Sequence, residues 1–138
     1  MPVKQLFLFL IAIFTIFIVS EQATAMEQDY QLDKCVVVTH CVRENWKVSN
    51  FKKTFDNVET IIRNTPRTKI VENENYYIHA EAKTKWRRYT DDLLIKGFPE
   101  KSLIQVRSES RVGVGDNGVN QKRVDELAYR LMTNQLDK

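Results

Sequence analysis

The sequence contains few of the residues that divide or cross-link a chain. Its 138 residues include four glycines, three prolines and two cysteines, and no stretch forms an internal repeat, a low-complexity tract or a Gly/Ser linker. Without such a divider, a chain of this length has room for one domain with one hydrophobic core, but not for two. The two cysteines allow at most one disulfide within the chain, which would add to the stability that the core provides.

A strong charge of either sign is also missing. The 21 Lys and Arg residues are offset by 18 Asp and Glu residues, which leaves a net charge of +3. No stripe of Lys and Arg is interleaved with stacking aromatic residues, and no nucleic-acid-binding motif occurs. We therefore expect no nucleic-acid partner.

A long apolar run occurs near the N-terminus. The run Leu6–Val19 is followed by Ala23-Thr-Ala25, the small-x-small pattern of a signal-peptidase site. The run is shorter than the roughly 17 to 25 residues of a membrane-spanning helix, so a retained anchor is the weaker alternative. We predict a signal peptide over residues 1–25, cleavage before Met26, and a mature single domain over residues 26–138 without a transmembrane span.

The only two cysteines are Cys35 and Cys41. An exported protein meets an oxidising compartment, so we predict that they form a disulfide. Free thiols are one alternative. A metal site is another, because His40 adjoins Cys41 and His79 could complete a ligand set, but the spacing matches no usual zinc pattern. We therefore predict no metal ligands here.

Hydrophobic periodicity predicts a helix, four strands and a second helix. Apolar residues recur at helical spacing after the N-cap residue Ser49 and stop at Asn64-Thr-Pro66. We expect strands at residues 68–72, 76–85, 92–98 and 102–112, and a last helix capped by Asn120. The connections between strands are too short for parallel crossovers. The predicted fold class is α+β: a four-stranded antiparallel sheet with two helices on one face, in the order α-β-β-β-β-α.

The last predicted strand alternates between small or apolar residues and charged ones. Arg107 and Arg111 share one face with Glu109 between them, whereas Ser108 and Ser110 should point into the core. Neighbouring strands extend the charged face with Glu81, Lys83, Lys85 and His79. One interpretation is a solvated, ion-paired sheet face. The other is a recess for a carboxylate, a phosphate or an acidic partner surface, which the fork of arginine binds well.

Gly113, Gly115 and Gly118 spell G-x-G-x-x-G at the corner between this strand and the last helix. The pattern is that of a dinucleotide-binding loop, but too few residues follow it for a second parallel strand and a ribose-binding acid. We therefore predict no cofactor, and interpret the glycines as residues of positive φ or tight packing. The helix N-terminus behind them could still attract an anion.

The sequence predicts no catalytic residues. Asp91 and Asp92 are adjacent in a strand and point to opposite faces, so they cannot form one carboxylate pair. A nucleophile set with His79 and Asp92 is discounted because the available serines, Ser108 and Ser110, should point into the core. Asp116 is more simply a helix cap or turn former. The other aspartates are better explained as partners of nearby arginines, namely Arg87, Arg88 and Arg107.

The segment between the second and third predicted strands has no period of its own. It places Trp86 and Tyr89 beside Arg87 and Arg88. This amphipathic patch could rest at a membrane surface or stack against a partner. The alternative is that Trp86 plugs the core at the sheet edge.

The run from Ile104 to Val124, with Asp91-Asp92 and Thr65-Pro-Arg67 upstream, resembles the signature of the domain of unknown function 1499 family. Its Arg-Ser-x-Ser-Arg-Val-Gly portion is specific. Many members carry Pro-Asn-Cys-Val-Ser where this chain has Thr39-His-Cys-Val-Arg43. Short exported members resemble those of cyanobacteria and plastids, so the resemblance implies the periplasm or thylakoid lumen. It implies no activity and no catalytic residue.

These features predict a non-enzymatic exported binding module, or an accessory or assembly protein of a membrane complex, with a protein partner. The residues expected to bind the partner or an anion are Arg107, Arg111, Arg87, Arg88, Trp86, Asp92, Asp116 and Asn120. The alternative is an enzyme or small-ligand binder with an anion pocket built from Arg107, Arg111, Asp92 and the glycine corner. A deep pocket at these residues would favour the alternative, and a flat charged face would favour the module.

Overall fold

The elements along the chain follow the order β-α-β-β-β-β-α. A computed structural model places residues 31–113 and 115–136; the predicted signal peptide and its cleavage before Met26 lie outside these residues. The elements are β1 (Cys41–Lys47), α2 (Phe51–Arg63), β2 (Thr68–Glu74), β3 (Tyr77–Lys83), β4 (Thr90–Phe98), the 3₁₀ turn η1 (Pro99–Lys101), β5 (Leu103–Ser110) and α3 (Val119–Leu136). The α+β class is confirmed, but the predicted count of four strands is wrong.

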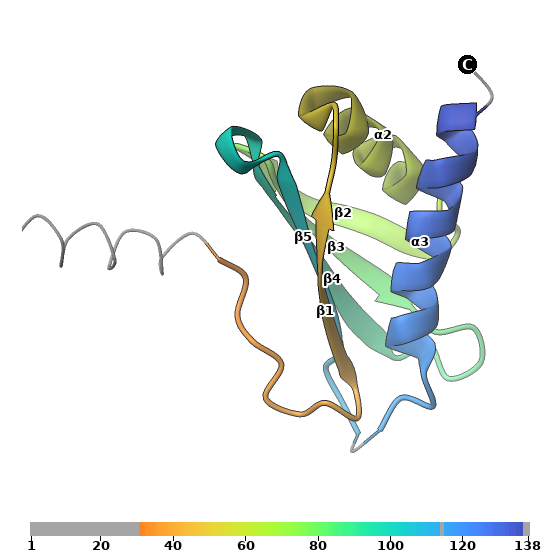
Figure 1. The fold of residues 1–138 in the computed structure, drawn as a ribbon. Helices are drawn as coiled ribbons and strands as arrows, with labels where there is room; N and C mark the ends of the chain where they lie inside the picture. The colour runs from red at the N-terminus through yellow and green to blue at the C-terminus, as the bar shows by residue number, and fades with distance from the viewer. Residues whose placement is uncertain (1–30, 114, 137–138) are drawn as a thin grey trace, which may run out of the picture. The chain divides into compact units, whose positions relative to one another are not determined.

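The strands form one antiparallel sheet in the order β1-β5-β4-β3-β2. The two helices cover one face of this sheet, as predicted, and no helix of residues 31–113 and 115–136 covers the other face (Figure 1). We call the second face the open face. The antiparallel arrangement of β2 to β5 follows from their short connections, because each strand returns directly beside its predecessor.

The strand that the sequence did not reveal is β1. Val42 and Trp46 face the helices and pack against the core, but Glu44 stands between them and breaks the apolar alternation. Trp46 Nε1 donates to Glu44 Oε2 at 2.9 Å, which lets the carboxylate lie in this row. The strand is held by β5, with Cys41 opposite Glu109 and more than sixty positions apart in sequence. Local pattern carries no trace of such a distant pairing.

The core lies between the helices and the sheet. The first helix buries the apolar residues that predicted it, Phe51, Phe55, Val58, Ile61 and Ile62. Gly97 in β4 lies directly under this helix, and a Cβ atom there would come within 2.6 Å of the Phe51 ring. The missing side chain therefore lets the helix approach the sheet.

The first helix is capped one residue later than predicted. Asn50 is its N-cap, and its side-chain oxygen accepts a hydrogen bond from the Lys53 N–H at 3.1 Å. Ser49 precedes the cap. Both residues are good N-caps, so their order in the sequence could not decide between them.

The segment that precedes β1 folds back over the open face. Leu32 N donates to Gln105 Oε1 at 3.0 Å, and both residues are buried. The predicted disulfide between Cys35 and Cys41 is confirmed, with an S–S distance of 2.00 Å, so neither cysteine is free. It ties this segment to the first residue of β1.

Candidate functional site

The open face carries a row of three carboxylates. Glu81, Asp92 and Glu109 are direct cross-strand neighbours on β3, β4 and β5. Carboxylates in such positions repel one another unless cations lie between them. The face is therefore stable only if the chain supplies those cations itself.

Arginine side chains supply them, and His79 adds a hydrogen bond. Arg111 donates to both oxygens of Asp92, from Nε at 2.8 Å and from Nη2 at 2.7 Å, and from Nη2 to Glu81 Oε1 at 2.7 Å. His79 Nε2 lies 2.6 Å from Asp92 Oδ1. Arg107 Nη2 donates to Glu109 Oε2 at 2.5 Å. The row is thus an internal ion-pair network.

The network shifts the pKa values of its members. The hydrogen bonds from Arg111 lower the pKa of Asp92, partial burial opposes this, and the contact with His79 adds to the lowering. The hydrogen bonds to Asp92 and then to Glu81 raise the pKa of Arg111. Both groups therefore stay charged at neutral pH, and neither is poised to exchange a proton there.

Arg107 and Arg111 share one face of the sheet, as the alternation predicted. The expectation that both are exposed is wrong for Arg107, whose side chain is 11% exposed, against 42% for Arg111. Glu81 and His79 join this face as expected. Lys85 does not, because it lies in the β3–β4 loop with its Nζ over the Trp86 ring. An anionic ligand at these arginines would have to compete with carboxylates that already bind them.

A second polar network lies under the helices. Asp91 and Asp92 point to opposite faces, as predicted, and the Asp91 side chain is 1% exposed. Its Oδ2 accepts from Arg123 Nη2 at 2.7 Å. Arg123 Nη1 donates to Ser108 Oγ at 2.9 Å and to Asn120 Oδ1 at 2.7 Å. Ser108 and Ser110 are buried on this side, also as predicted.

Asn120 joins three parts of the chain in this buried network. Its Oδ1 accepts from Ser108 Oγ at 2.6 Å, and its Nδ2 donates to Ser110 Oγ and to the His40 carbonyl, both at 2.9 Å. These bonds connect α3 to β5 and to the disulfide loop. The signature residues in this network therefore hold the fold together.

The prediction that Asn120 caps the last helix is wrong. The helix begins at Val119, and Asp116 accepts from the N–H groups of Gly118 at 2.9 Å and Asn120 at 2.7 Å. Burial acts to raise the pKa of Asp116, but these hydrogen bonds outweigh it and lower the pKa. Asp116 is thus a capping group, which was the simpler of its two interpretations.

Sequence reasoning did not single out Arg123. It precedes Val124, a core residue, and lies one helical turn after Asn120. Val124, Leu127 and Leu131 form the buried face of α3. Asn120 and Arg123 lie at the N-terminal end of that face, where they meet the serines of β5, so the helical period could have revealed Arg123. Their partners could then only be polar groups of the sheet.

The glycine corner packs against the disulfide loop. Gly113 has φ 97° and Gly118 has φ 76°, which confirms the positive-φ interpretation for these two glycines. His40 Nδ1 lies 2.9 Å from the Gly113 carbonyl, and Asp116 N donates to the Thr39 carbonyl at 3.2 Å. The corner thus binds its own chain.

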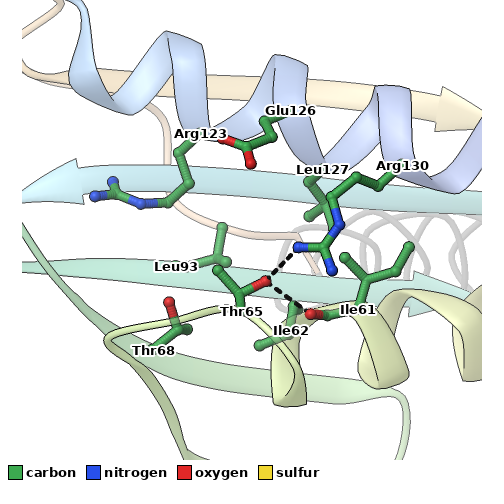
Figure 2. Close-up of a pocket in the computed structure, with 9 residues that line it drawn as sticks. All are labelled: Ile61, Ile62, Thr65, Thr68, Leu93, Arg123, Glu126, Leu127 and Arg130. Atoms are coloured by element: carbon green, nitrogen blue, oxygen red, sulfur yellow. Dashed lines mark hydrogen bonds between the residues drawn. The ribbon is translucent and has the colours of Figure 1, made fainter.

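A pocket of about 40 Å³ opens between the two helices and the sheet. Figure 2 shows the Arg130 guanidinium beside Thr65, and Arg130 Nη1 donates to Thr65 Oγ1 at 2.8 Å. The Arg123 side chain extends away from Thr65 and Arg130. The lining residues are Ile61, Ile62, Thr65, Thr68, Leu93, Arg123, Glu126, Leu127 and Arg130. Arg107, Arg111 and Asp92 do not line it, so this pocket is not the predicted anion pocket.

Three loops meet at one end of the sheet. They are the disulfide loop (35–41), the β3–β4 loop (84–89) and the β5–α3 corner (111–113 and 115–118), which emerge where β1 and β4 begin and where β3 and β5 end. We call this the loop end. Figure 1 shows the disulfide loop and the corner at the bottom of the sheet and the β3–β4 loop at its lower right. Ser110 N donates to the His40 carbonyl, which joins the end of β5 to the disulfide loop, and Arg111 N donates to the Thr90 carbonyl, which joins the corner to the start of β4.

The loop end exposes large apolar side chains. Trp86 is 86% exposed, so the interpretation of Trp86 as a core plug is wrong. Val36 and Val38 in the disulfide loop are 89% and 78% exposed, and Val112 at the corner is 53% exposed. Arg87 and Arg88 are exposed beside Trp86, as predicted. Exposed apolar side chains of this size, on loops at the same end of a sheet, are compatible with an interaction surface.

Within the described residues, no helix is both long enough and apolar enough to cross a membrane. A comparison with curated proteins found no match. The chain matches the family described as protein of unknown function (DUF1499) over residues 20–131, which include β1 to β5 and most of α3. The chain therefore belongs to the DUF1499 family.

Proposed function

We propose that this protein is a non-enzymatic binding module, accessory to a membrane complex, and that it recognises its partner through the loop end. The observation that carries the proposal is the exposure of Trp86, Val36 and Val38 in two loops that emerge from the same end of the sheet. Burying such side chains against a partner stabilises a complex, whereas leaving them in water costs free energy.

The polar groups support a binding role more than a catalytic one. Asp92 and Arg111 are held as ions by one another, and the two serines considered as nucleophiles are buried in a hydrogen-bond network. No group of three or more His, Cys, Asp or Glu side chains among residues 31–113 and 115–136 is arranged to hold a metal ion. The open face is therefore best explained as a rigid scaffold behind the loop end.

The proposal includes export to the periplasm or thylakoid lumen. The Cys35–Cys41 disulfide is compatible with an oxidising compartment. The apolar run Leu6–Val19 and the Ala23-Thr-Ala25 pattern supply the signal. N-terminal sequencing of the exported protein should find Met26 as the first residue, and an intact Met1 would contradict this part of the proposal.

Affinity purification from native membranes tests the binding role. Tagged wild-type protein should retain a membrane complex in a fixed stoichiometry, and Trp86→Ala or Val36→Ser should reduce recovery at least tenfold, because an anchor residue contributes roughly 2 kcal/mol or more. Tyr129→Ala is the matched control, since Tyr129 is a 63% exposed aromatic residue on α3. It should leave recovery unchanged.

The same purification also tests the enzymatic or small-ligand alternative. A small anion that co-purifies with wild-type protein and is lost with Arg111→Gln, in the absence of any protein partner, would replace the binding module with a ligand-binding protein. Loss of the partner with Tyr129→Ala as well as Trp86→Ala would show that recovery does not depend on the loop end.

A further inference from the structure

The three loops of the loop end differ in chemical character. The β3–β4 loop carries Trp86 together with Lys85, Arg87 and Arg88, and residues 83–90 contain no Asp or Glu. The disulfide loop exposes valines, and its one ionisable side chain, His40, is turned toward the Gly113 carbonyl. Apolar tips therefore lie beside cations at one end of the sheet.

We propose that the loop end seats the domain on an anionic lipid surface. The inference rests on the proposed function and deepens it, because it names the bilayer around the membrane complex as a surface that the loop end contacts beside its protein partner. Trp and Tyr rings prefer the interface between lipid headgroups and acyl chains, and Lys and Arg are attracted to anionic headgroups. Trp86 and the arginines beside it supply both contacts from one short loop.

Charge complementarity favours a lipid surface over a protein patch. The acidic residue in the corner loop is Asp116, and it is engaged by the N–H groups of Gly118 and Asn120. Of the acids in the adjoining parts of β3 and β4, Glu81 and Asp92 are bound to Arg111, and Asp91 is bound to Arg123. The cations of the β3–β4 loop thus face outward without an acid of their own loop, which suits a diffuse field of negative headgroups.

The geometry also suits shallow insertion. The Lys85 Nζ lies 5.4 Å from the Trp86 ring centroid, so ring and ammonium group are held together. The disulfide ties the valine loop to β1, so fewer conformations are lost when the loop meets a surface. A bilayer accepts both an aromatic ring and aliphatic tips without shape matching.

Co-sedimentation with lipid vesicles tests the inference. The exported, processed protein should sediment with vesicles of equal parts phosphatidylcholine and phosphatidylglycerol, and not with vesicles of phosphatidylcholine alone. Binding should weaken as salt is added. Arg87→Gln/Arg88→Gln should weaken binding about 25-fold, from about fivefold for each cation near an anionic surface.

Two further variants make the test specific. Lys52→Gln/Lys53→Gln removes the same charge from exposed residues of α2, whose first turn follows the opposite end of β1, and should change binding less than twofold. Trp46→Phe leaves Trp86 as the only tryptophan of the chain, and its fluorescence should shift to shorter wavelength when mixed vesicles are added. An unshifted emission would overturn the inference.

The outcomes separate this inference from the proposed function. If wild-type protein ignores the mixed vesicles but a membrane protein complex still binds it in a Trp86-dependent way, the lipid inference fails and the binding module stands. If the α2 variant loses as much vesicle binding as the loop variant, attraction is set by net charge and the loop end has no special role.

Discussion

Asp91 and Asp92 are consecutive residues of β4, and each binds an arginine, but on opposite faces of the sheet. The Asp91–Arg123 pair lies under the helices, with side chains 1% and 16% exposed. The Asp92–Arg111 pair lies on the open face, with side chains 24% and 42% exposed. Both pairs join an aspartate to an arginine and differ only in their burial. Their comparison therefore shows what burial adds to an ion pair.

Burial makes the first pair a condition of folding. A carboxylate taken out of water costs several kcal/mol unless a cation and hydrogen bonds replace the water. Asp91 Oδ1 is buried without a hydrogen-bond partner in the described parts of the chain, so Arg123 is the main compensation for the Asp91 charge. Asp92 keeps access to solvent and would remain hydrated without Arg111.

The largest expected effect comes from removing the buried cation. Arg123→Gln should lower the free energy of unfolding by about 3 to 5 kcal/mol, because it leaves the Asp91 carboxylate uncompensated. Urea denaturation followed by circular dichroism measures the change. Arg111→Gln is the matched control and should cost about 1 kcal/mol or less. Equal losses for the two variants would contradict the distinction between the faces.

A double variant sharpens the same comparison. Asp91→Asn/Arg123→Gln removes both charges, so it should be less destabilising than the sum of its single variants. The residual loss would come from the hydrogen bonds that Arg123 makes to Ser108 and Asn120. Strict additivity would show that Asp91 and Arg123 do not act as a pair.

The sequence predicts which face each aspartate occupies, but the arginine partners predicted for them, Arg87, Arg88 and Arg107, are wrong, because Asp91 binds Arg123 and Asp92 binds Arg111. The period of two in β4 and β5 assigns Asp91 and Ser108 to the core side and Asp92 and Arg111 to the other. Arg123 lies 32 positions from Asp91, and the pairing depends on how α3 crosses the sheet. No local pattern encodes that crossing.

The same limit explains β1 and the loop end. The hydrophobic periodicity of α2 and of β3 to β5 is strong enough to predict them from the sequence. Strand β1 instead depends on pairing with β5, far along the chain. The position of Trp86 in an aperiodic segment left two interpretations open, and the choice depends on where the β3–β4 loop emerges. Loop positions are set by the sheet that holds them, which only the folded chain defines.

The next effect concerns the disulfide, whose loop and preceding residues contact both faces of the sheet. Its loop contacts the buried network through the His40 carbonyl, and the residues just before it cover Gln105 on the open face. Reduction of Cys35–Cys41 should lower the free energy of unfolding by about 2 kcal/mol, since a short loop is released in the unfolded chain. Urea denaturation with and without reductant measures this change. The control is Cys35→Ala/Cys41→Ala, whose unfolding free energy should not change when reductant is added.

The smallest effect is expected from acid on the open face. Arg111 lowers the pKa of Asp92 below its ordinary value of about 3.9, so the ion pair stabilises the fold above that pH and the contribution is lost as pH falls through the lowered pKa. The groups that face Asp92 are Arg111, His79, Glu81 and Glu109. Below about pH 4, the unfolding free energy of wild-type protein should lose the contribution of this ion pair, up to about 1 kcal/mol. Arg111→Gln lacks the ion pair at every pH and has no such contribution to lose. The difference in unfolding free energy between the two proteins should therefore narrow in acid. If the difference in unfolding free energy stays constant from neutral pH to pH 2, Arg111 stabilises the fold through packing. Its charge would then contribute nothing, even on the open face.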